Sequence, residues 1–279
     1  MTFPAFQALV ANFEKAYIAL KMEAPTRQRA VGAGRKGVLE SMEARVFFTL
    51  LYYKTYPTFD VLAFLFGRAR GRCCEDIHFF TQVMEKALGH AMVLPRRKIR
   101  SPEEFMEAFP EIKEVFLDGT ERKIQRPKGG KRQRKTYSGK KKAHTRKNLV
   151  MCDNKKRILL VSPTKSGRRH DKRLADKNAI IQTIPKDVDV VVDTGFQGAQ
   201  HPKLLIPKKG SKRNPLTPDE KESNQIISSC RVVVEHAIAG LKRFRVISDK
   251  FRNRIGVFDE RTVRVGAGLW NFGLLYQNA

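Results

Sequence analysis

Two aspartates stand where the sequence pattern would place them for chemistry. Asp118 follows the apolar run 115–117, and Asp193 closes the valine-rich run 190–192. Such runs are typical of buried central strands, and α/β sheets bind ligands at the carboxyl ends of their strands. Asp-Gly and Asp-Thr-Gly are also common turn sequences, so either residue alone fits an ordinary turn equally well.

Glu235 adds a third carboxylate from a predicted helix. The Thr-Pro-Asp-Glu sequence at 217–220 predicts a helix start, and the helix should run to about residue 244. Helical spacing places Glu235 with Arg231 and Lys242 on a polar stripe that borders an apolar face. An i, i+4 pair of Arg231 with Glu235 is usually an exposed salt bridge, but the apolar neighbours favour a position turned away from solvent.

Three acids from two strands and one helix fit metal-dependent phosphate chemistry. Two divalent ions about 3.5–4 Å apart can activate a water and stabilise the leaving oxygen of an in-line displacement. Mg²⁺ takes carboxylate oxygens and keeps open positions for water and phosphate, and Mn²⁺ suits the same ligands. We therefore predict that Asp118, Asp193 and Glu235 are catalytic and bind Mg²⁺, as two ions that Mn²⁺ can replace.

The charge of the chain predicts a polyanionic partner. There are 55 Lys+Arg against 28 Asp+Glu, a net charge of +27. Residues 116–279 contribute 38 − 15 = +23 of this, and residues 1–115 contribute 17 − 13 = +4. Nucleic acids fit such an excess because basic groups set against phosphates release condensed counterions. Charge alone is equally compatible with a structural RNA binder or a solvated surface.

The basic tract (residues 122–147) is the densest part of this charge. It holds 13 Lys/Arg in 26 residues and no acid, with Tyr137 and His144 interleaved. Its turn-forming centre predicts an ordered hairpin at the edge of the site, although a disordered tract would have the same composition. The lysines expected to hold a DNA backbone are Lys140, Lys141 and Lys142 here, and Lys208 and Lys209 in a second cluster with Lys212 and Arg213.

The first part of the chain predicts a small helical domain. An amphipathic helix and a Gly-rich basic hinge, 32–37, precede helical spacing over 42–53, 59–66 and 68–88. Thr58 can cap the second of these helices, and Gly67 can end it in a left-handed turn. The last helix opens with Arg68, Arg70 and Arg72, which gives the outline of a helix-turn-helix; a plain three-helix bundle fits as well.

From residue 115 the pattern changes to short strands alternating with helices. β-type runs occur at 115–117, 148–151, 158–161, 188–192 and 204–206, with a helix over 170–181. This order predicts a mixed α/β sheet, so the fold class is α+β with two domains. Four cysteines without a CxxC pair indicate neither zinc nor disulfides, and no apolar run predicts a membrane span. An intracellular protein, associated with DNA in the cytoplasm or nucleoid, is expected.

Four motifs resemble those of the DDE superfamily of transposases, and more narrowly insertion-sequence transposases with an N-terminal helix-turn-helix, related to the Harbinger type. They are Phe-Leu-Asp-Gly-Thr-Glu at 116–121, Tyr-Ser-Gly-Lys-Lys-Lys at 137–142, Val-Asp-Thr-Gly-Phe-Gln-Gly at 192–198 and Arg-Val-Val-Val-Glu-His at 231–236. Their acids are 193 − 118 = 75 and 235 − 193 = 42 residues apart. His170 and Asp171 also look like family positions, and Arg231 and Lys242 are auxiliary candidates.

The resemblance implies a helical DNA-binding domain over 1–100, with the helix-turn-helix at about 42–88, a linker helix over 101–114 and a ribonuclease H-like catalytic domain over 115–279. It implies binding of terminal inverted repeats, Mg²⁺-dependent cleavage of double-stranded DNA at element ends, and joining to target DNA, with a homodimer as one way to pair two ends. The alternatives are a transposase-derived DNA-binding protein without cleavage activity, a structural RNA binder and a standalone ribonuclease.

Overall fold

The chain divides into two compact units. The computed structural model describes residues 1–23, 37–211 and 213–277, so residues 32–36 of the predicted hinge at 32–37 and Lys212 lie outside the described residues. Contacts group Met1–Leu94 with Leu241–Ala279, which we call the helical unit, and gather Pro95–Gly240 into the sheet unit. Among the described helices, none combines the length and hydropathy needed to cross a membrane.

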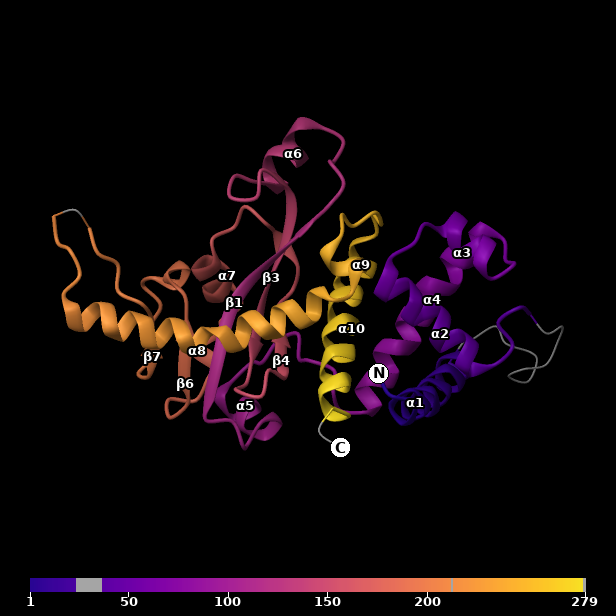
Figure 1. The fold of residues 1–279 in the computed structure, drawn as a ribbon, viewed down its shortest axis with the longest axis horizontal. Helices are drawn as coiled ribbons and strands as arrows, with labels where there is room; N and C mark the ends of the chain where they lie inside the picture. Colours follow the sequence, from indigo (N-terminus) through magenta and orange to yellow (C-terminus); the bar gives the residue numbers. More distant parts are fainter. Residues whose placement is uncertain (24–36, 212, 278–279) are drawn as a thin grey trace. The chain divides into compact units, whose positions relative to one another are not determined.

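Six helices form the described part of the helical unit (Figure 1). They are α1 Phe3–Met22, α2 Met42–Thr55, α3 Phe59–Leu65, α4 Arg70–His90, α9 Arg245–Ser248 and α10 Gly256–Leu275. Hydroxyl side chains of Thr2, Ser41 and Thr58 accept backbone N–H groups at the starts of the first three helices. These caps lie directly before the predicted apolar stretches, which is why the helices begin where the sequence indicated.

The predicted helix-turn-helix corresponds to α2, α3 and α4. Gly67 ends the turn after α3 with a φ of +56°, the left-handed conformation that favours glycine. Edge-to-face contacts join Phe48 of α2 to Phe80 of α4, with ring centroids 6.2 Å apart, and join Phe13 of α1 to the same Phe80 at 6.0 Å. Helix α4 begins at Arg70, two residues later than expected, so Arg68 lies in the turn before it.

The end of the chain belongs to the helical unit, which differs from the predicted division. The sequence groups 241–279 with the catalytic domain, but α10 packs on α4 and α9 on α2. Arg252 fixes this segment to α2: its backbone N–H donates to Tyr56 Oη at 2.7 Å, and its guanidinium lies 4.0 Å from the centroid of the Tyr56 ring. Arg261 Nε lies 2.7 Å from Glu85 Oε2 of α4. These partners are distant in sequence, so helical periodicity could not reveal them.

The sheet unit contains a seven-stranded mixed sheet. Its strands are β1 Glu114–Lys123, β2 Tyr137–Ser138, β3 Ala143–Cys152, β4 Ile158–Val161, β5 Lys165–Ser166, β6 Asp189–Val192 and β7 Leu204–Leu205. The order is β2-β3-β1-β6-β7, with β4 and β5 also paired to β3. Strand β1 runs antiparallel to β3 and parallel to β6. All five predicted strands are present, and the mixed α/β domain is confirmed.

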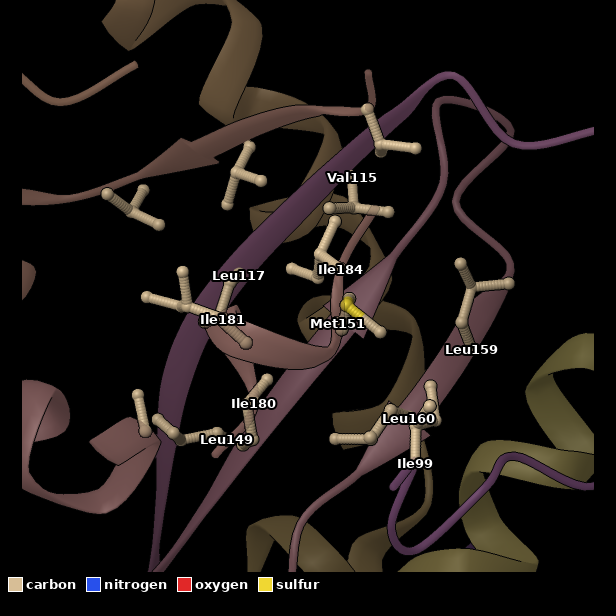
Figure 2. Close-up of a cluster of buried hydrophobic side chains, with 14 of the residues drawn as sticks. Ile99, Val115, Leu117, Leu149, Met151, Leu159, Leu160, Ile180, Ile181 and Ile184 are labelled. Atoms are coloured by element: carbon tan, nitrogen blue, oxygen red, sulfur yellow. The ribbon is translucent and has the colours of Figure 1, made fainter. Parts of the chain in front are cut away.

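One face of this sheet carries the main core of the unit. Alternate residues of β1, Val115 and Leu117, are fully buried there, and Leu149 and Met151 of β3 join them. Figure 2 shows these side chains meeting Ile180, Ile181 and Ile184 from the segment after α7 (Asp171–Lys177). Because successive strand residues alternate between faces, Asp118 belongs to the opposite face from Leu117.

Three elements of the sheet unit differ from the sequence-based expectation. The linker helix is only α5, Pro102–Ala108, because β1 already begins at Glu114. Residues 95–100 also belong to this unit, since Arg96 pairs with Leu160 beside β4. The basic tract is ordered between β1 and β3, but it contains a helix, α6 (Gly130–Thr136), rather than a simple turn.

Candidate active site

Asp118 and Asp193 lie next to each other on neighbouring parallel strands. The last paired residues of β1 and β6 are Leu117 and Val192, and the two aspartates are the next residue of each strand. Residues in register on parallel strands face the same side of a sheet, so both carboxylates lie on the face opposite the main core. The valine run before Asp193 is fully buried, as predicted for a central strand. The structure therefore brings together two acids that are 75 residues apart.

The two strands end differently at this point. Strand β1 continues past Asp118 to Lys123, paired with β3 throughout, whereas β6 stops and Asp193 caps a short 3₁₀ turn, η2 (Thr194–Phe196). Asp193 Oδ1 accepts the Gly195 N–H at 2.7 Å, and Asp118 Oδ1 accepts the Gly119 N–H at 2.6 Å. Both carboxylates are thus oriented by their own following glycines.

Asp171, the first residue of α7, places a third carboxylate between these glycines. A Cβ at Gly119 would lie 2.3 Å from Asp171 Oδ1, and a Cβ at Gly195 would lie 3.4 Å from Asp171 Oδ2 and 2.7 Å from Asp193 Oδ1. The glycines are therefore required for close approach rather than for an unusual backbone angle. Gly119 shares the main-core face with Leu117, so Asp171 reaches this end of the strands from the side opposite Asp118. We call Asp118, Asp171 and Asp193 the acid centre.

A buried lysine supports the acid centre from β3. Lys147 Nζ lies 3.1 Å from Asp171 Oδ1 and 3.5 Å from Glu121 Oε1, and it donates to the Arg169 carbonyl at 3.1 Å. The Lys147 side chain is 9% exposed and that of Glu121 is 7% exposed. Charges removed from water to this extent are stable only when paired, so this network fixes the start of α7 against the strands.

The environment of Asp118 disfavours its ionised form. Burial raises its pKa to about 6, and the neighbouring carboxylates of Asp193 and Asp171 act in the same direction. The Gly119 N–H and the Arg231 guanidinium oppose this effect by lowering the pKa. A desolvated carboxylate beside two others is a position that a bound cation would stabilise.

Arg231, rather than Glu235, is the α8 residue that acts on the acid centre. Figure 1 shows α8 (Pro218–Lys242) crossing the strands of the sheet unit, and the Arg231 side chain is 19% exposed. The Glu235 side chain is 57% exposed, with Oε1 4.0 Å from Arg231 Nη2. The expected inward orientation of Glu235 is therefore wrong in this structure. The apolar face that suggested it is buried at Val234, Ile238 and Leu241, whereas Glu235 beside it is exposed.

The donors present fit a divalent metal in part. Asp118 and Asp193 offer hard carboxylate oxygens on one face of the sheet, which is the ligand chemistry of Mg²⁺. Across the described residues, no three His, Cys, Asp or Glu side chains are grouped closely enough to hold a metal ion. Strand register brings Asp118 and Asp193 to one face of the sheet, and the exposed Glu235 is not grouped with them.

The two remaining auxiliary candidates lie at the ends of helices. His170 is the exposed N-cap residue of α7, directly before Asp171, and its side chain makes no capping hydrogen bond. Lys242 lies in the last turn of α8, in the part of the chain grouped with the helical unit. Of the four auxiliary candidates, Asp171 and Arg231 are those that the structure brings to Asp118.

Each arginine predicted to read DNA has an acidic partner within the helical unit. Arg68 Nε lies 2.5 Å from Asp76 Oδ2, with both side chains largely buried. Arg70 lies 3.2 Å from Asp60 and Arg72 lies 2.8 Å from Glu75, and these four side chains are about 70% exposed. Exposed pairs of this kind are weak, so Arg70 and Arg72 can exchange their partners for DNA more readily than Arg68 can.

The predicted phosphate-binding lysines also separate into two groups. Lys140, Lys141 and Lys142 are exposed in the turn between β2 and β3. Lys208 is instead tied to α8, because its Nζ lies 3.1 Å from Glu220 Oε1 and its backbone N–H donates to Asn224 Oδ1 at 2.8 Å. Lys209, next to it, is exposed.

The Lys147–Glu121–Asp171 network was missed by sequence reasoning. Lys147 was counted in the basic tract as part of the predicted phosphate-binding surface. The signal was alternation: Thr145, Lys147 and Leu149 are buried on β3, and Thr120 and Arg122 on β1 are buried, as is Ile124 just after it. Extending the predicted strands by a few residues would have turned these positions inward.

Comparisons with known proteins identify the family of the chain. A model of the DDE superfamily endonuclease family matches residues 117–271, and a model of the helix-turn-helix of DDE superfamily endonucleases matches residues 38–89. A protein of Microchaete diplosiphon named "Probable transposase for insertion sequence element IS702" is 28% identical over 235 residues, which cover 84% of this chain and 81% of that protein. No solved structure matches significantly. The chain therefore belongs to the DDE superfamily of endonucleases, among the insertion-sequence transposases that carry an N-terminal helix-turn-helix.

Proposed function

We propose that this protein is a DNA transposase that binds the terminal inverted repeats of its element, cleaves the ends by metal-dependent phosphodiester hydrolysis and joins them to target DNA. The observation that carries the proposal is the placement of Asp118 and Asp193 side by side where β6 ends. Two carboxylates on one face of a sheet, at the end of a parallel strand, are suited to hold a hard cation against a phosphate.

In this proposal Asp118 and Asp193 hold Mg²⁺, as two ions with Glu235 as third ligand, and Mn²⁺ can substitute. Bound ions supply Lewis-acid stabilisation of the phosphate and lower the pKa of a bound water. Glu235 must first turn from its exposed position, where its nearest charged partner is Arg231. Arg231 balances the charge of Asp118 in the metal-free protein, and Lys147 holds Asp171 in place between the two glycines.

Two surfaces bind double-stranded DNA, one through contacts to bases and the other through contacts to phosphates. Arg70 and Arg72, at the start of α4, contact base edges of the terminal repeats, because the N-terminal residues of a recognition helix usually enter the major groove. The exposed lysines Lys140, Lys141, Lys142 and Lys209 contact phosphates of the element end and the target, and Lys208 does so after leaving Glu220. A homodimer that pairs two ends completes the proposal.

The test is incubation of the purified protein with duplexes carrying the flanking genomic ends of its element, a supercoiled target plasmid and either Mg²⁺ or EDTA. We expect strand cleavage at the ends and covalent end–plasmid joints in Mg²⁺ only. Tight binding of the ends without cleavage would instead indicate a transposase-derived DNA-binding protein. Equal cleavage in EDTA would remove the metal from the proposal.

A further inference from the structure

The basic tract and Arg168 line an open pocket that the proposed cleavage chemistry does not use. Its volume is about 660 Å³, and the residues that line it include Arg126, Arg134, Arg168, Tyr137, His144 and Gly139. Pockets for small ligands typically measure about 300–1,000 Å³. The segments that form it are the end of β1, helix α6, the β2–β3 turn and the loop before α7.

The chemistry of the lining matches a nucleotide. Three of the lining residues are arginines, and none of the lining residues in the described part of the chain is acidic. Guanidinium groups bind phosphates in paired hydrogen bonds, and aromatic rings stack on the faces of bases. The Tyr137 side chain supplies such a ring and is 45% exposed, so a ligand can reach it.

Side-chain contacts hold the pocket in shape. The Tyr137 ring packs edge-on against His144, with centroids 5.6 Å apart, and Thr136 Oγ1 lies 3.1 Å from His144 Nδ1. Arg126 Nη2 donates to Gln133 Oε1 at 2.9 Å, which joins the end of β1 to α6. The pocket is therefore a built feature of the tract rather than a gap between loose loops.

The pocket lies along the same ribbon of strands as the acid centre. The N–H of Ile124, the residue that follows β1, donates to the His144 carbonyl, six residues along the chain from Asp118 (124 − 118 = 6). At about 3.3 Å per strand residue this is a separation of about 20 Å. Figure 1 shows α6 at the far end of β1 and β3. One DNA strand rises about 3.4 Å per nucleotide, so roughly six nucleotides span the distance from Asp118 to the pocket.

We infer that this pocket holds one unpaired nucleotide of the bound DNA, with its base against Tyr137 and its phosphate on the arginines. The inference rests on the proposed function, because it requires DNA on this surface. A base inside a duplex cannot enter, since its faces are covered by its stacked neighbours, and extruding it costs free energy. DNA that already contains an unpaired base avoids this cost and should bind more tightly.

The test compares a fully paired duplex with the same duplex carrying a single central unpaired 2-aminopurine, using the full-length protein in EDTA. Fluorescence anisotropy gives the two dissociation constants, and 2-aminopurine emission reports whether the base stacks on an aromatic ring. We expect the wild type to bind the bulged duplex roughly tenfold more tightly, which is within the range of one base–aromatic stack. The emission should be quenched on binding.

Glycine variants give a matched control within the tract. A Cβ at Gly139 or at Gly130 meets no atom within 4 Å, and neither residue has a left-handed backbone, so a side chain can begin at both without strain. Gly139 lines the pocket and Gly130 does not. Gly139→Leu and Tyr137→Ala should each reduce the preference for bulged DNA to about onefold, whereas Gly130→Leu should keep it. Since the readout is a ratio for each variant, a general loss of affinity does not affect it.

Equal binding of the two duplexes by the wild type would overturn the inference, and so would a preference that survives in both Gly139→Leu and Tyr137→Ala. A loss in Arg134→Ala that is equal for both duplexes, with Tyr137→Ala unchanged, would show a plain backbone contact and also overturn it. The cleavage assay in Mg²⁺ is scored separately. A wild type that prefers bulged DNA but cuts nothing refutes the proposed function and leaves the nucleotide pocket standing.

Discussion

The acid centre of the sheet unit and the arginines of the helix-turn-helix are two sets of charged residues that are positioned in different ways. Asp118 and Asp193 come from distant segments, and the register of β1 with β6 sets them side by side. Arg70 and Arg72 are neighbours on one helix, and each is paired with a nearby acid. Strand register thus determines which residues of distant segments lie side by side. Helical spacing determines only the side of the helix on which a residue lies, and local packing determines which residue it pairs with.

Removal of the charge of each proposed metal ligand should give the largest effect, a loss of cleavage rate. Asp118→Asn, Asp193→Asn and Glu235→Gln keep the shape of each side chain but remove its charge. Because metal stabilisation of the transition state is worth several kcal/mol, each variant should lose at least about 1,000-fold in cleavage rate while still binding DNA. Single-turnover cleavage and gel-shift binding measure the two properties.

Glu235 gives the sharpest version of this test, because the structure leaves its side chain exposed. Near-wild-type cleavage by any one variant would remove that residue from the site. If Glu235→Gln alone stayed active, Glu235 would not be a metal ligand. Its exposed position, rather than its place in the sequence motif, would then have given the right answer.

The buried lysine should give the next largest effect. Lys147→Met leaves Glu121 and Asp171 without their partner, and breaking a buried ion pair typically costs about 3–5 kcal/mol. We expect the free energy of unfolding in urea to fall by about 3 kcal/mol. Lys140→Met, an exposed position in the same tract, should change it by less than about 0.5 kcal/mol. If the free energy of unfolding fell by similar amounts in the two variants, the buried ion pairs of Lys147 would not stabilise the sheet unit more than an exposed lysine does.

The effects of replacing the arginines of the helical unit should differ according to how deeply each arginine is buried. Arg70→Ala and Arg72→Ala should each reduce the preference for end sequence over random duplex by about 1–3 kcal/mol, since a specific base contact is worth this much. Arg68→Ala should mainly lower the free energy of unfolding, because Arg68 and Asp76 form a largely buried pair. Competition binding and urea unfolding separate the two outcomes. Unchanged discrimination in all three variants would favour the plain helical bundle.

The exposed lysines of the basic tract should give the smallest and most uniform effect. Each of Lys140→Ala, Lys141→Ala and Lys142→Ala should weaken end-sequence and random DNA equally. Loss of one phosphate contact should also flatten the slope of log affinity against log salt by about 0.9. Lys208→Ala should flatten it less, because Lys208 must first leave Glu220. A loss confined to end sequences, with the slope intact, would mean that these lysines read bases.

Much of the fold could be predicted because caps and periodicity are local. Thr58 and Gly67 bound α3 as expected, and the buried valine run placed Asp193 at the end of a central strand. The association of α10 with α4 could not be predicted, since it depends on contacts between residues about 180 positions apart. The role of Lys147 was missed because the predicted strand was too short. Strand β3 extends beyond the apolar run that indicated it, and the extension is what buries Lys147. The direction of Glu235 was wrong because a polar stripe beside an apolar one can turn either way.

Asp118 is proposed to bind a metal ion, and thermal unfolding of the wild type and of Asp118→Asn tests this assignment. Burial and neighbouring acids raise the pKa of Asp118 to about 6 from an ordinary 3.8. The folded state therefore binds this proton more tightly than the unfolded chain, so stability is lost as pH rises from about 4 through about 6. In EDTA at pH 7.5 the free energy of unfolding of the variant should exceed that of the wild type by about 1–2 kcal/mol. This difference should vanish near pH 4.

Addition of 10 mM Mg²⁺ (an excess chosen on the order of 100 times a sub-millimolar dissociation constant) should reverse this order at pH 7.5. The wild type should gain about 2–3 kcal/mol from the bound ion. Asp118→Asn should gain little, because it lacks the carboxylate that makes the site favourable. An equal Mg²⁺-dependent gain in both proteins, or a variant no more stable than the wild type in EDTA, would remove Asp118 from the proposed metal site.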